Sequence, residues 1–440
     1  MPARQSSVTV TVVAMGMRPM AGVLWLALLL TGAATPAAAQ TMGTHEAVSP
    51  AASWPDWLRP SAQERMRLDS DRWLQRARVG LTVTGRGWFS AMLEAQDARA
   101  FHSATQDGTL RDVTDLRQAW VAVGGGRQVA TLKVGRQKLA FGSERMLGGA
   151  EWANTARVFD AARLTLRRRA FHLDAFAAAL VVNNPDDWDH HQSDPVMLGV
   201  YGSLDTLLPG SAIEPYMVFR RRTRAAGDLG DSGASRVTTA GVRTAGRARA
   251  VWTYEVDAQL QRGPVASSRQ RAWAATVQAQ RSFPGHRGSP SLLLEGNYAS
   301  GDRRRGDSIV GSLDQLFPTN HGIYGVADRI ARRNALNARA GMAVRPWSRA
   351  TLKLEGHTFH LASRADALYA ASGQVAVAAV PGGATTGHVG EEVDVIADVK
   401  WSTHIDIGAQ FGVLRRGPFL RAYDRARPAP FYCLFIDLHL

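Results

Sequence analysis

Residues 251–262, VWTYEVDAQLQR, alternate strictly between apolar and polar side chains. Trp252 and Val256 share one parity, whereas Glu255 and Asp257 share the other. Because successive side chains of a β-strand point to opposite sides, this period of two predicts a strand with one apolar and one polar face. Both a soluble β-sandwich and a membrane β-barrel contain such strands, so the pattern alone does not separate the two folds.

The connections between such segments separate the two folds. The same alternation recurs in residues 273–280, 336–345, 352–357, 393–401 and 405–413. Counted back from a last strand at residues 431–440, links of about three to seven residues alternate with links of about seven to over thirty residues. Bacterial outer-membrane barrels alternate short periplasmic turns with longer outer loops in this way. The chain is therefore predicted to be an all-β, antiparallel, up-and-down transmembrane barrel.

The strand count and the two strand faces complete this prediction. The count gives about seventeen strands, and single-chain bacterial barrels have an even number, so one further strand is expected within residues 43–70. The longest outer loops are predicted at residues 138–160, 301–333 and 362–390. In such a barrel, Trp252 and Val256 face lipid, and Glu255 and Asp257 face a water-filled lumen.

The N-terminus has the pattern of a secretory signal peptide. Arg4 and Arg18 precede the apolar run of residues 21–30, and Ala37 and Ala39 are small residues before a cleavage point. We therefore expect residues 1–39 to be removed, residues 40–71 to hold the first strand, and residues 72–440 to form the rest of the barrel. No later segment approaches the 18 consecutive apolar residues of a spanning helix, so membrane insertion must use strands.

The net charge and the cysteine count limit the kinds of partner and metal site that the chain can have. The chain has 52 lysines and arginines against 38 acidic residues, a formal net charge of +14, which favours anionic partners. The single cysteine, Cys433, excludes an intramolecular disulfide and any cysteine-rich metal site.

Three segments resemble the alginate export family of outer-membrane barrels. They are GRQKLAFGSERMLGGAEWANTARVFDAARL at residues 135–164, YASGDRRRGDSIVGSLDQLFPTNHGIYGVADRI at residues 298–330 and LASRADALYAASG at residues 361–373. The resemblance extends over about residues 72–414. It implies an 18-stranded barrel, which agrees with the independent strand count. In the best-known relatives the pore exports an anionic uronate polymer through an arginine-rich lumen, whereas many other relatives have no assigned substrate.

Charged residues along the predicted lumen form a candidate conduit. Guanidinium groups pair bidentately with carboxylates, and neighbouring acids prevent an anion from binding too tightly to leave. The alternative is that these charges pair only with one another and brace a folded-in loop. The predicted conduit residues are Arg136, Arg145, Arg157, Asp160, Arg163, Arg339, Lys353 and Glu355, and further cations of inward parity are Arg167, Arg345 and Lys400.

Two other loops are candidates for a functional role. Residues 314–325, DQLFPTNHGIYG, are too apolar and aromatic for a free loop, so they predict a plug or lid folded against the mouth. Residues 186–195, DDWDHHQSDP, could hold a divalent cation, but their spacing matches neither a zinc helix nor a calcium loop, and an exposed polar loop is favoured. His357 and His360 have opposite parity and cannot share a metal. No metal site, cofactor or catalytic triad is predicted.

The sequence therefore predicts a channel in the bacterial outer membrane that passes anionic carbohydrate of the alginate type. The alternative is a passive porin for small, anionic solutes. The expected partners are outer-membrane lipid and lipopolysaccharide, the anionic permeant and periplasmic export proteins, without nucleic acid. The protein is expected to be a monomer and not an enzyme.

Overall fold

The computed structural model describes residues 54–85, 87–103, 108–125, 129–169, 171–426 and 428–440. The chain divides into residues 1–46 and 47–440, and all described residues belong to the second unit. The predicted signal peptide, residues 1–39, lies outside the described residues.

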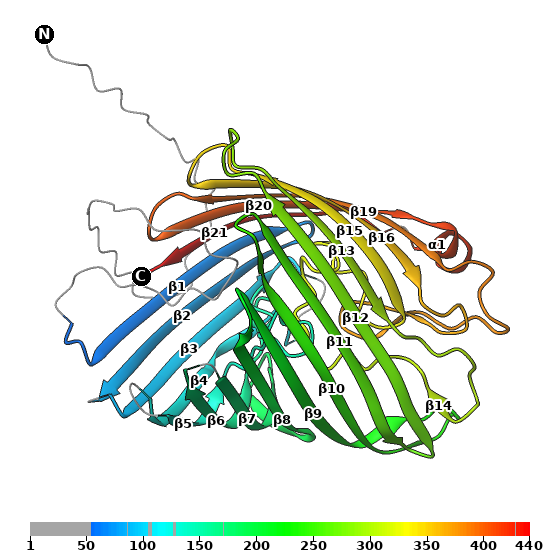
Figure 1. The fold of residues 1–440 in the computed structure, drawn as a ribbon, viewed down its shortest axis with the longest axis horizontal. Coiled ribbons are helices and arrows are strands. Elements are labelled where there is room, and N and C mark those ends of the chain that lie inside the picture. The colour runs from blue at the N-terminus through cyan, green and yellow to red at the C-terminus, as the bar shows by residue number, and fades with distance from the viewer. Residues whose placement is uncertain (1–53, 86, 104–107, 126–128, 170, 427) are drawn as a thin grey trace, which may run out of the picture. The chain divides into compact units, whose positions relative to one another are not determined.

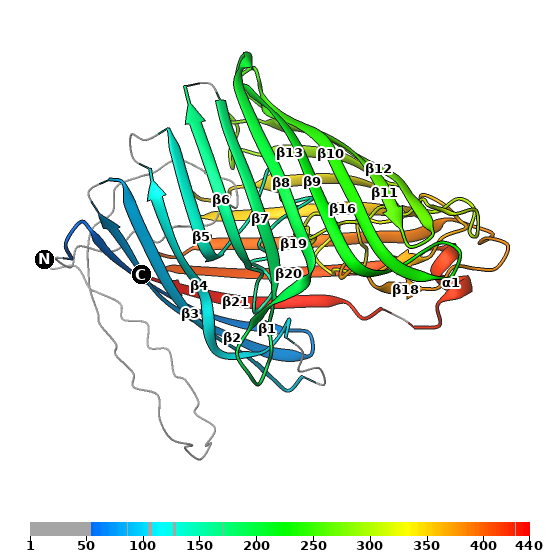
Figure 2. The same cartoon turned by 90° about the horizontal axis from the view of Figure 1, so that it is seen from below.

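Eighteen antiparallel strands form one sheet that closes on itself, as predicted. Figures 1 and 2 show these strands following one another around the sheet in chain order. The strands are β1 (Leu58–Asp69), β2 (Arg72–Gly85), β3 (Phe89–Phe101), β4 (Asp112–Gly124), β5 (Ala130–Gln137), β6 (Phe159–Arg168), β7 (Phe171–Val182), β8 (His190–Leu208), β9 (Ser211–Ala226), β10 (Ser232–Ala248), β11 (Trp252–Val265), β12 (Ser268–Ser282), β13 (Ser291–Ala299), β15 (Ala335–Val344), β16 (Ala350–Leu361), β19 (His388–Lys400), β20 (Ile405–Arg416) and β21 (Phe431–His439).

Smaller elements lie in the loops. β14 (Ile309–Val310) pairs in parallel with β12. β17 (Leu368–Tyr369) and β18 (Val375–Val377) form a separate two-stranded sheet, and α1 (Pro418–Tyr423) is a short helix. Among the described residues, no helix has the length and apolar character needed to cross a bilayer.

The barrel closes through β1, the strand that was expected within residues 43–70. β1 pairs with β2 on one side and with β21 on the other, from Gln63 opposite His439 to Asp69 opposite Cys433. Its lumenal side chains include Arg65 and Arg67, which are buried. The sequence signal was weak because the outward face of this strand, which includes Met66, also carries Pro60 and Glu64, so its apolar alternation is interrupted.

The two faces of β11 have the burial of a membrane strand. Val256 and Leu260 are 38% and 56% exposed, whereas Asp257 and Gln261 are 3% and 0% exposed. A soluble sandwich would bury the apolar set and expose the polar set, so this inverted pattern identifies the outer face as the one that meets lipid. The polar face differs from the predicted one, because here it is packed against other polar groups rather than open to water.

Short and long connections alternate as predicted. The turn from β15 to β16 and the turn from β19 to β20 lie at the end with short links, which the barrel rule assigns to the periplasm. The link between β11 and β12, which the backward count places in the long series with about seven residues, is instead a tight hairpin turn at Ala266 and Ser267. The predicted alternation of short and long connections is therefore correct for the barrel as a whole, but the connection between β11 and β12 is shorter than predicted.

Two long loops fold into the lumen and cover the polar faces of the strands. The first inserted loop is residues 138–158, between β5 and β6, and the second is residues 300–334, between β13 and β15. Leu147 of the first forms an isolated parallel bridge with Phe317 of the second. Tyr324 of the second loop packs in a buried apolar cluster with Phe359 of β16. This packing agrees with the predicted plug at residues 314–325.

Candidate permeation site

Five arginines line one side of the lumen, and together they are called the arginine patch: Arg65, Arg67, Arg76, Arg78 and Arg117. They come from the inward alternation of β1, β2 and β4, and all five are buried. The register places Arg65 directly opposite Arg76, and Gln63 opposite Arg78. Because side chains at i and i+2 of a strand share a face, neighbouring strands concentrate these guanidinium groups on one surface.

The arginine patch holds the tip of the first inserted loop by its backbone. Arg65 donates from Nη1 to the carbonyl oxygen of Glu151 at 3.1 Å, and Arg67 donates from Nη1 to that of Trp152 at 2.6 Å. Arg76 also donates to the carbonyl oxygen of Glu151, at 3.0 Å. Hydrogen bonds from charged donors are stronger than neutral ones, so these contacts fix the loop against the wall.

The side chain of Glu151 lies among the charged groups of the same patch. It makes ion pairs with Arg78 at 2.9 Å, Arg117 at 2.6 Å and Lys138 at 2.7 Å. Burial alone would raise the pKa of Glu151, but Arg117, Arg78 and Lys138 outweigh burial and hold that pKa well below its usual range. The side chain is 29% exposed, so part of this carboxylate faces free space inside the lumen at the edge of the patch, although the residue lies deep within the barrel.

The same loop carries a cation to the other side of the lumen. Arg145 Nη2 lies 2.9 Å from Glu295 Oε2 of β13, and Arg145 Nε lies 3.5 Å from Glu255 Oε1 of β11. Arg339 also approaches Glu295, at 3.6 Å, and pairs with Glu355. The structure thus joins three predicted conduit residues, Arg145, Arg339 and Glu355, around Glu295. Arg145 is buried, as the bracing alternative expects.

Two other predicted conduit arginines also have protein partners. Arg163 faces the lumen from β6 and pairs with Asp174 of β7 at 2.7 Å. Arg157 donates from Nη1 to the carbonyl oxygen of Phe317 at 2.7 Å, which links the two inserted loops. Burial lowers the pKa of Arg157 to about 10, so the guanidinium remains charged at neutral pH. Lys353 faces the lumen from β16, toward the short-turn end of the barrel.

Arg136 and Asp160 lie on the other face of the wall. They are cross-strand partners, paired at 3.0 Å. Arg136 is two residues from Val134 on β5, and Asp160 is two residues from Ala162 on β6, so each pair shares a strand face. Val134 and Ala162 are opposite each other and are exposed on the outer face. His191 lies 3.3 Å from Asp160 in the same group. This pair therefore lies at the rim of the outer face, whereas the sequence had placed it along the lumen.

The sequence model of alginate export proteins matches residues 60–429. The chain belongs to the alginate export family. Comparison with curated protein sequences gave no match.

Solved structures show the same fold for this alginate export family member. Pseudomonas aeruginosa OpdK, solved with vanillate, matches with a TM-score of 0.58 and 12% identity over 87% of this chain and 98% of OpdK. Acinetobacter baumannii OccAB2 matches with a TM-score of 0.59 and 11% identity over 88% of this chain and 99% of OccAB2. Pseudomonas aeruginosa OccK11 gives a TM-score of 0.57 and 12% identity over 87% and 95% of the two chains. Family and fold are those of outer-membrane channels, so the protein is a channel of the bacterial outer membrane.

The arginine patch of this alginate export family barrel was missed by sequence reasoning. A signal was present, because Arg65 and Arg67, and again Arg76 and Arg78, have the i, i+2 spacing that places two side chains on one strand face. The first pair falls in the strand that was expected within residues 43–70 but whose position and faces the sequence did not define. The second pair was not singled out, because its partner, Glu151, lies in a loop far along the chain.

The predicted exposed loop at residues 186–195 has a contact that spacing could not predict. Asp189 meets Asp112 and Asp115, with one ligand atom of each within 4.8 Å of the others. Burial, together with Asp115, raises the pKa of Asp189 to about 6. Three neighbouring carboxylates from two distant segments therefore lie at the base of this loop.

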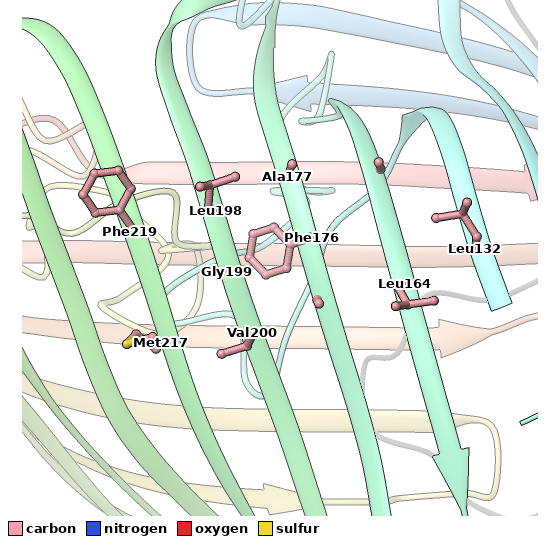
Figure 3. A pocket seen from close by; sticks show the side chains of 11 residues that line it. Leu132, Leu164, Phe176, Ala177, Leu198, Gly199, Val200, Met217 and Phe219 are labelled. Atoms are coloured by element: carbon pink, nitrogen blue, oxygen red, sulfur yellow. The ribbon is translucent and has the colours of Figure 1, made fainter. Parts of the chain in front are cut away.

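An apolar groove on the barrel lies away from the permeation path. Figure 3 shows its lining residues on neighbouring strands, among them Leu132, Leu164, Leu198 and Met217. Its small residues, such as Ala177, leave a shallow depression on the lipid-facing surface. A groove of this composition suits hydrocarbon chains and offers nothing to a charged permeant.

Proposed function

We propose that the channel passes anionic carbohydrate of the alginate type, a polymer of uronate residues. The observation that carries this proposal is the position of Glu151. An intrinsic carboxylate lies between Arg78, Arg117 and Lys138 at a partly exposed edge of the arginine patch. The protein thus already places a carboxylate where a uronate carboxylate of the permeant would be stabilised.

The physical argument is one of exchange between carboxylates. Guanidinium groups bind carboxylates bidentately and remain charged, so a permeant anion can replace Glu151 without a change in protonation. A fixed competitor also keeps the anion from binding too tightly, and a permeant has to leave as well as enter. This exchange requires the loop tip at Glu151 to move, since the arginines behind it are buried.

The charges at the short-turn end of the lumen also favour an anionic permeant. Arg167, Arg345 and Lys400 lie at the strand ends near the short turns and are exposed, and Lys353 faces the lumen nearby. A ring of cations at the periplasmic entrance would raise the local concentration of a polyanion. In this proposal, the conduit uses Lys353 and Arg163 together with the arginine patch, whereas Arg145, Arg339 and Glu355 hold the first inserted loop in place.

A passive porin for small anionic solutes is the second candidate. It is favoured by the packing of the two inserted loops, which bury Leu147, Leu316 and Tyr324 inside the barrel and restrict the lumen. The neighbour OpdK was solved with vanillate, which is a small carboxylate. For either permeant we propose transport without catalysis or a cofactor, by a monomer embedded in lipid and lipopolysaccharide. Polymer export would add periplasmic partners.

The two candidates differ in a planar-bilayer experiment with purified protein. Reversal potentials in a KCl gradient test anion preference, and polyguluronate or polymannuronate added to one side tests polymer block against neutral dextran of the same length. Polymer export predicts an anion-selective channel that long uronate chains block more strongly than dimers. Block by dimers alone would favour the small-solute porin, and cation selectivity would reject both.

A further inference from the structure

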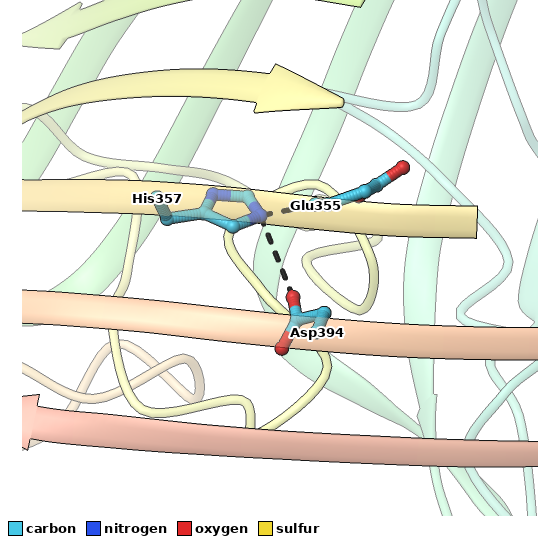
Figure 4. A group of neighbouring side chains, drawn as sticks. All are labelled: Glu355, His357 and Asp394. Atoms are coloured by element: carbon cyan, nitrogen blue, oxygen red, sulfur yellow. Dashed lines mark ion pairs between the residues drawn. The ribbon is translucent and has the colours of Figure 1, made fainter. Parts of the chain in front are cut away.

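A histidine and two carboxylates meet on the lumenal face of β16 and β19. Figure 4 shows Glu355 and His357 of β16 beside Asp394 of β19, with dashed lines from His357 toward both carboxylates. One ligand atom of each residue lies within 4.8 Å of the others. His357 Nε2 lies 3.5 Å from Asp394 Oδ2 and 4.0 Å from Glu355 Oε2.

These groups are buried, and several of their polar atoms lack partners. The side chains of His357 and Asp394 are both 0% exposed. Glu392, opposite His357 in the register, is also 0% exposed. Among the described residues, His357 Nε2, Asp394 Oδ1 and Glu392 Oε2 have no hydrogen-bond partner. Leaving a buried polar atom unsatisfied is unfavourable, so these orphaned atoms on neighbouring residues of one lumenal face indicate a missing cation or a shared proton.

The charge at this place also points to a cation. Within the described part of the chain, neither Glu392 nor Asp394 forms an ion pair with an arginine or a lysine, and Arg339 is already shared between Glu355 and Glu295. Two neighbouring buried carboxylates with orphaned oxygens repel each other unless a cation or a shared proton lies between them.

We propose that Glu355, His357 and Asp394 bind one divalent metal ion of the zinc class. Imidazole and carboxylate are ligands that Zn²⁺ accepts, whereas Ca²⁺ and Mg²⁺ are held by oxygen ligands alone. Ligand atoms around a tetrahedral Zn²⁺ are about 3.3 Å apart for bonds of about 2.0 Å. The separations of 3.5 and 4.0 Å are close to that value, and Glu355 Oε2 would keep Arg339 as a second partner beside the metal. Water completes the coordination.

The metal would also act on the second inserted loop. Val326 donates its backbone N–H to Asp394 Oδ2 at 3.2 Å, and Ala327 donates to Glu392 Oε1 at 3.0 Å. A cation that neutralises these carboxylates removes the repulsion behind two of the loop's anchoring bonds. The site is therefore a clamp between the wall and the loop, and it does not depend on which anion the channel passes.

Zinc binding to the purified full barrel tests the site. The protein is prepared without a polyhistidine tag, stripped with a chelator and titrated with Zn²⁺ by calorimetry, with the stoichiometry checked by elemental analysis. We expect one Zn²⁺ per chain and an affinity at least about tenfold lower in His357→Gln and in Asp394→Asn. Two control variants should stay within about twofold of wild type: His172→Gln, from a histidine–carboxylate pair on β7, and His360→Gln, from the stacked pair with His388.

Three results of the binding measurements would overturn the proposal. The first is a wild-type barrel that binds no Zn²⁺, which is expected if Glu392 and Asp394 share a proton instead. The second is a His357→Gln variant that binds Zn²⁺ as tightly as wild type does. The third is a loss of binding in His360→Gln alone. Heat modifiability checks that each variant has folded. If the variants do not fold, the zinc X-ray absorption spectrum of the wild type decides, since the site requires one imidazole nitrogen with oxygen ligands. An all-oxygen shell or two imidazoles would contradict it.

Discussion

Arg145 and Glu151 lie on the same inserted loop and make ion pairs with opposite sides of the closed sheet. Arg145 Nη2 is 2.9 Å from Glu295 Oε2 of β13, and Glu151 Oε2 is 2.9 Å from Arg78 Nη1 of β2. Each wall thus receives the charge that it lacks: the acidic side binds a cation, and the arginine patch binds an anion. The loop has one favourable orientation across the lumen, because turning it around would place like charges together.

Replacing Arg145 should destabilise the barrel strongly. In Arg145→Ala, Glu255 and Glu295 lose a buried partner, and removing one member of a buried ion pair costs about 3–5 kcal/mol. Unfolding in urea with the protein in lipid vesicles measures this loss. The exposed Arg303→Ala is the control, and its free energy of unfolding should change by about 0.5 kcal/mol or less. Equal stability of both variants would mean that Arg145 is not a structural anchor.

The sequence predicted the fold far better than the site, for a physical reason. A strand with one face in lipid must alternate between apolar and polar side chains, so the residue types of Val256 and Asp257 indicate which face each side chain lies on. The partners of Glu151 and Arg145 depend instead on how a loop enters the lumen, which no local period records. Packing inside the lumen also gives Asp257 partners other than open water: Tyr216 of β9 donates to it at 2.7 Å, and Arg332 of the second inserted loop lies 3.4 Å from it.

Tolerance of charge should follow strand parity on β12. Val277 is 57% exposed on the lipid face, so Val277→Arg should cost about 2–4 kcal/mol near the midplane of the bilayer. Its neighbour Gln278 faces the lumen opposite Glu255, so Gln278→Arg places a cation near an acid and should cost less than about 1 kcal/mol. Both variants are compared by unfolding in vesicles. Similar losses for the two variants would contradict the assignment of the faces.

The loop between β7 and β8 should loosen as the pH rises through about 6. The pKa of Asp189 is raised to about 6 in the folded protein, so its contribution to stability is complete below the ordinary carboxyl pKa and is lost as the pH passes 6. Amide hydrogen exchange at residues 183–189, corrected for intrinsic rates, should show less protection at pH 7.5 than at pH 5. In Asp189→Asn the difference between the two pH values should shrink. An unchanged difference in that variant would assign the effect to another group.

The last prediction concerns Glu151 and selectivity. Glu151→Gln removes the carboxylate that offsets Arg78, Arg117 and Lys138, so the edge of the arginine patch gains a net positive charge. Anion selectivity should therefore rise, and block by uronate oligomers should strengthen, at low salt. Both effects should fade near 1 M salt, where the screening length falls to about 3 Å.

The matched control for this variant is Glu144→Gln. Glu144 is an acid of the same loop, and it accepts hydrogen bonds from Thr319 and from the backbone of Gly149 rather than from the arginine patch. The reversal potential in a KCl gradient compares the two variants with wild type. A shift toward anions in Glu151→Gln alone supports an anionic conduit at the patch. If both variants shift equally, the effect comes from the overall charge of the loop, and if neither shifts, the permeating ions do not pass Glu151.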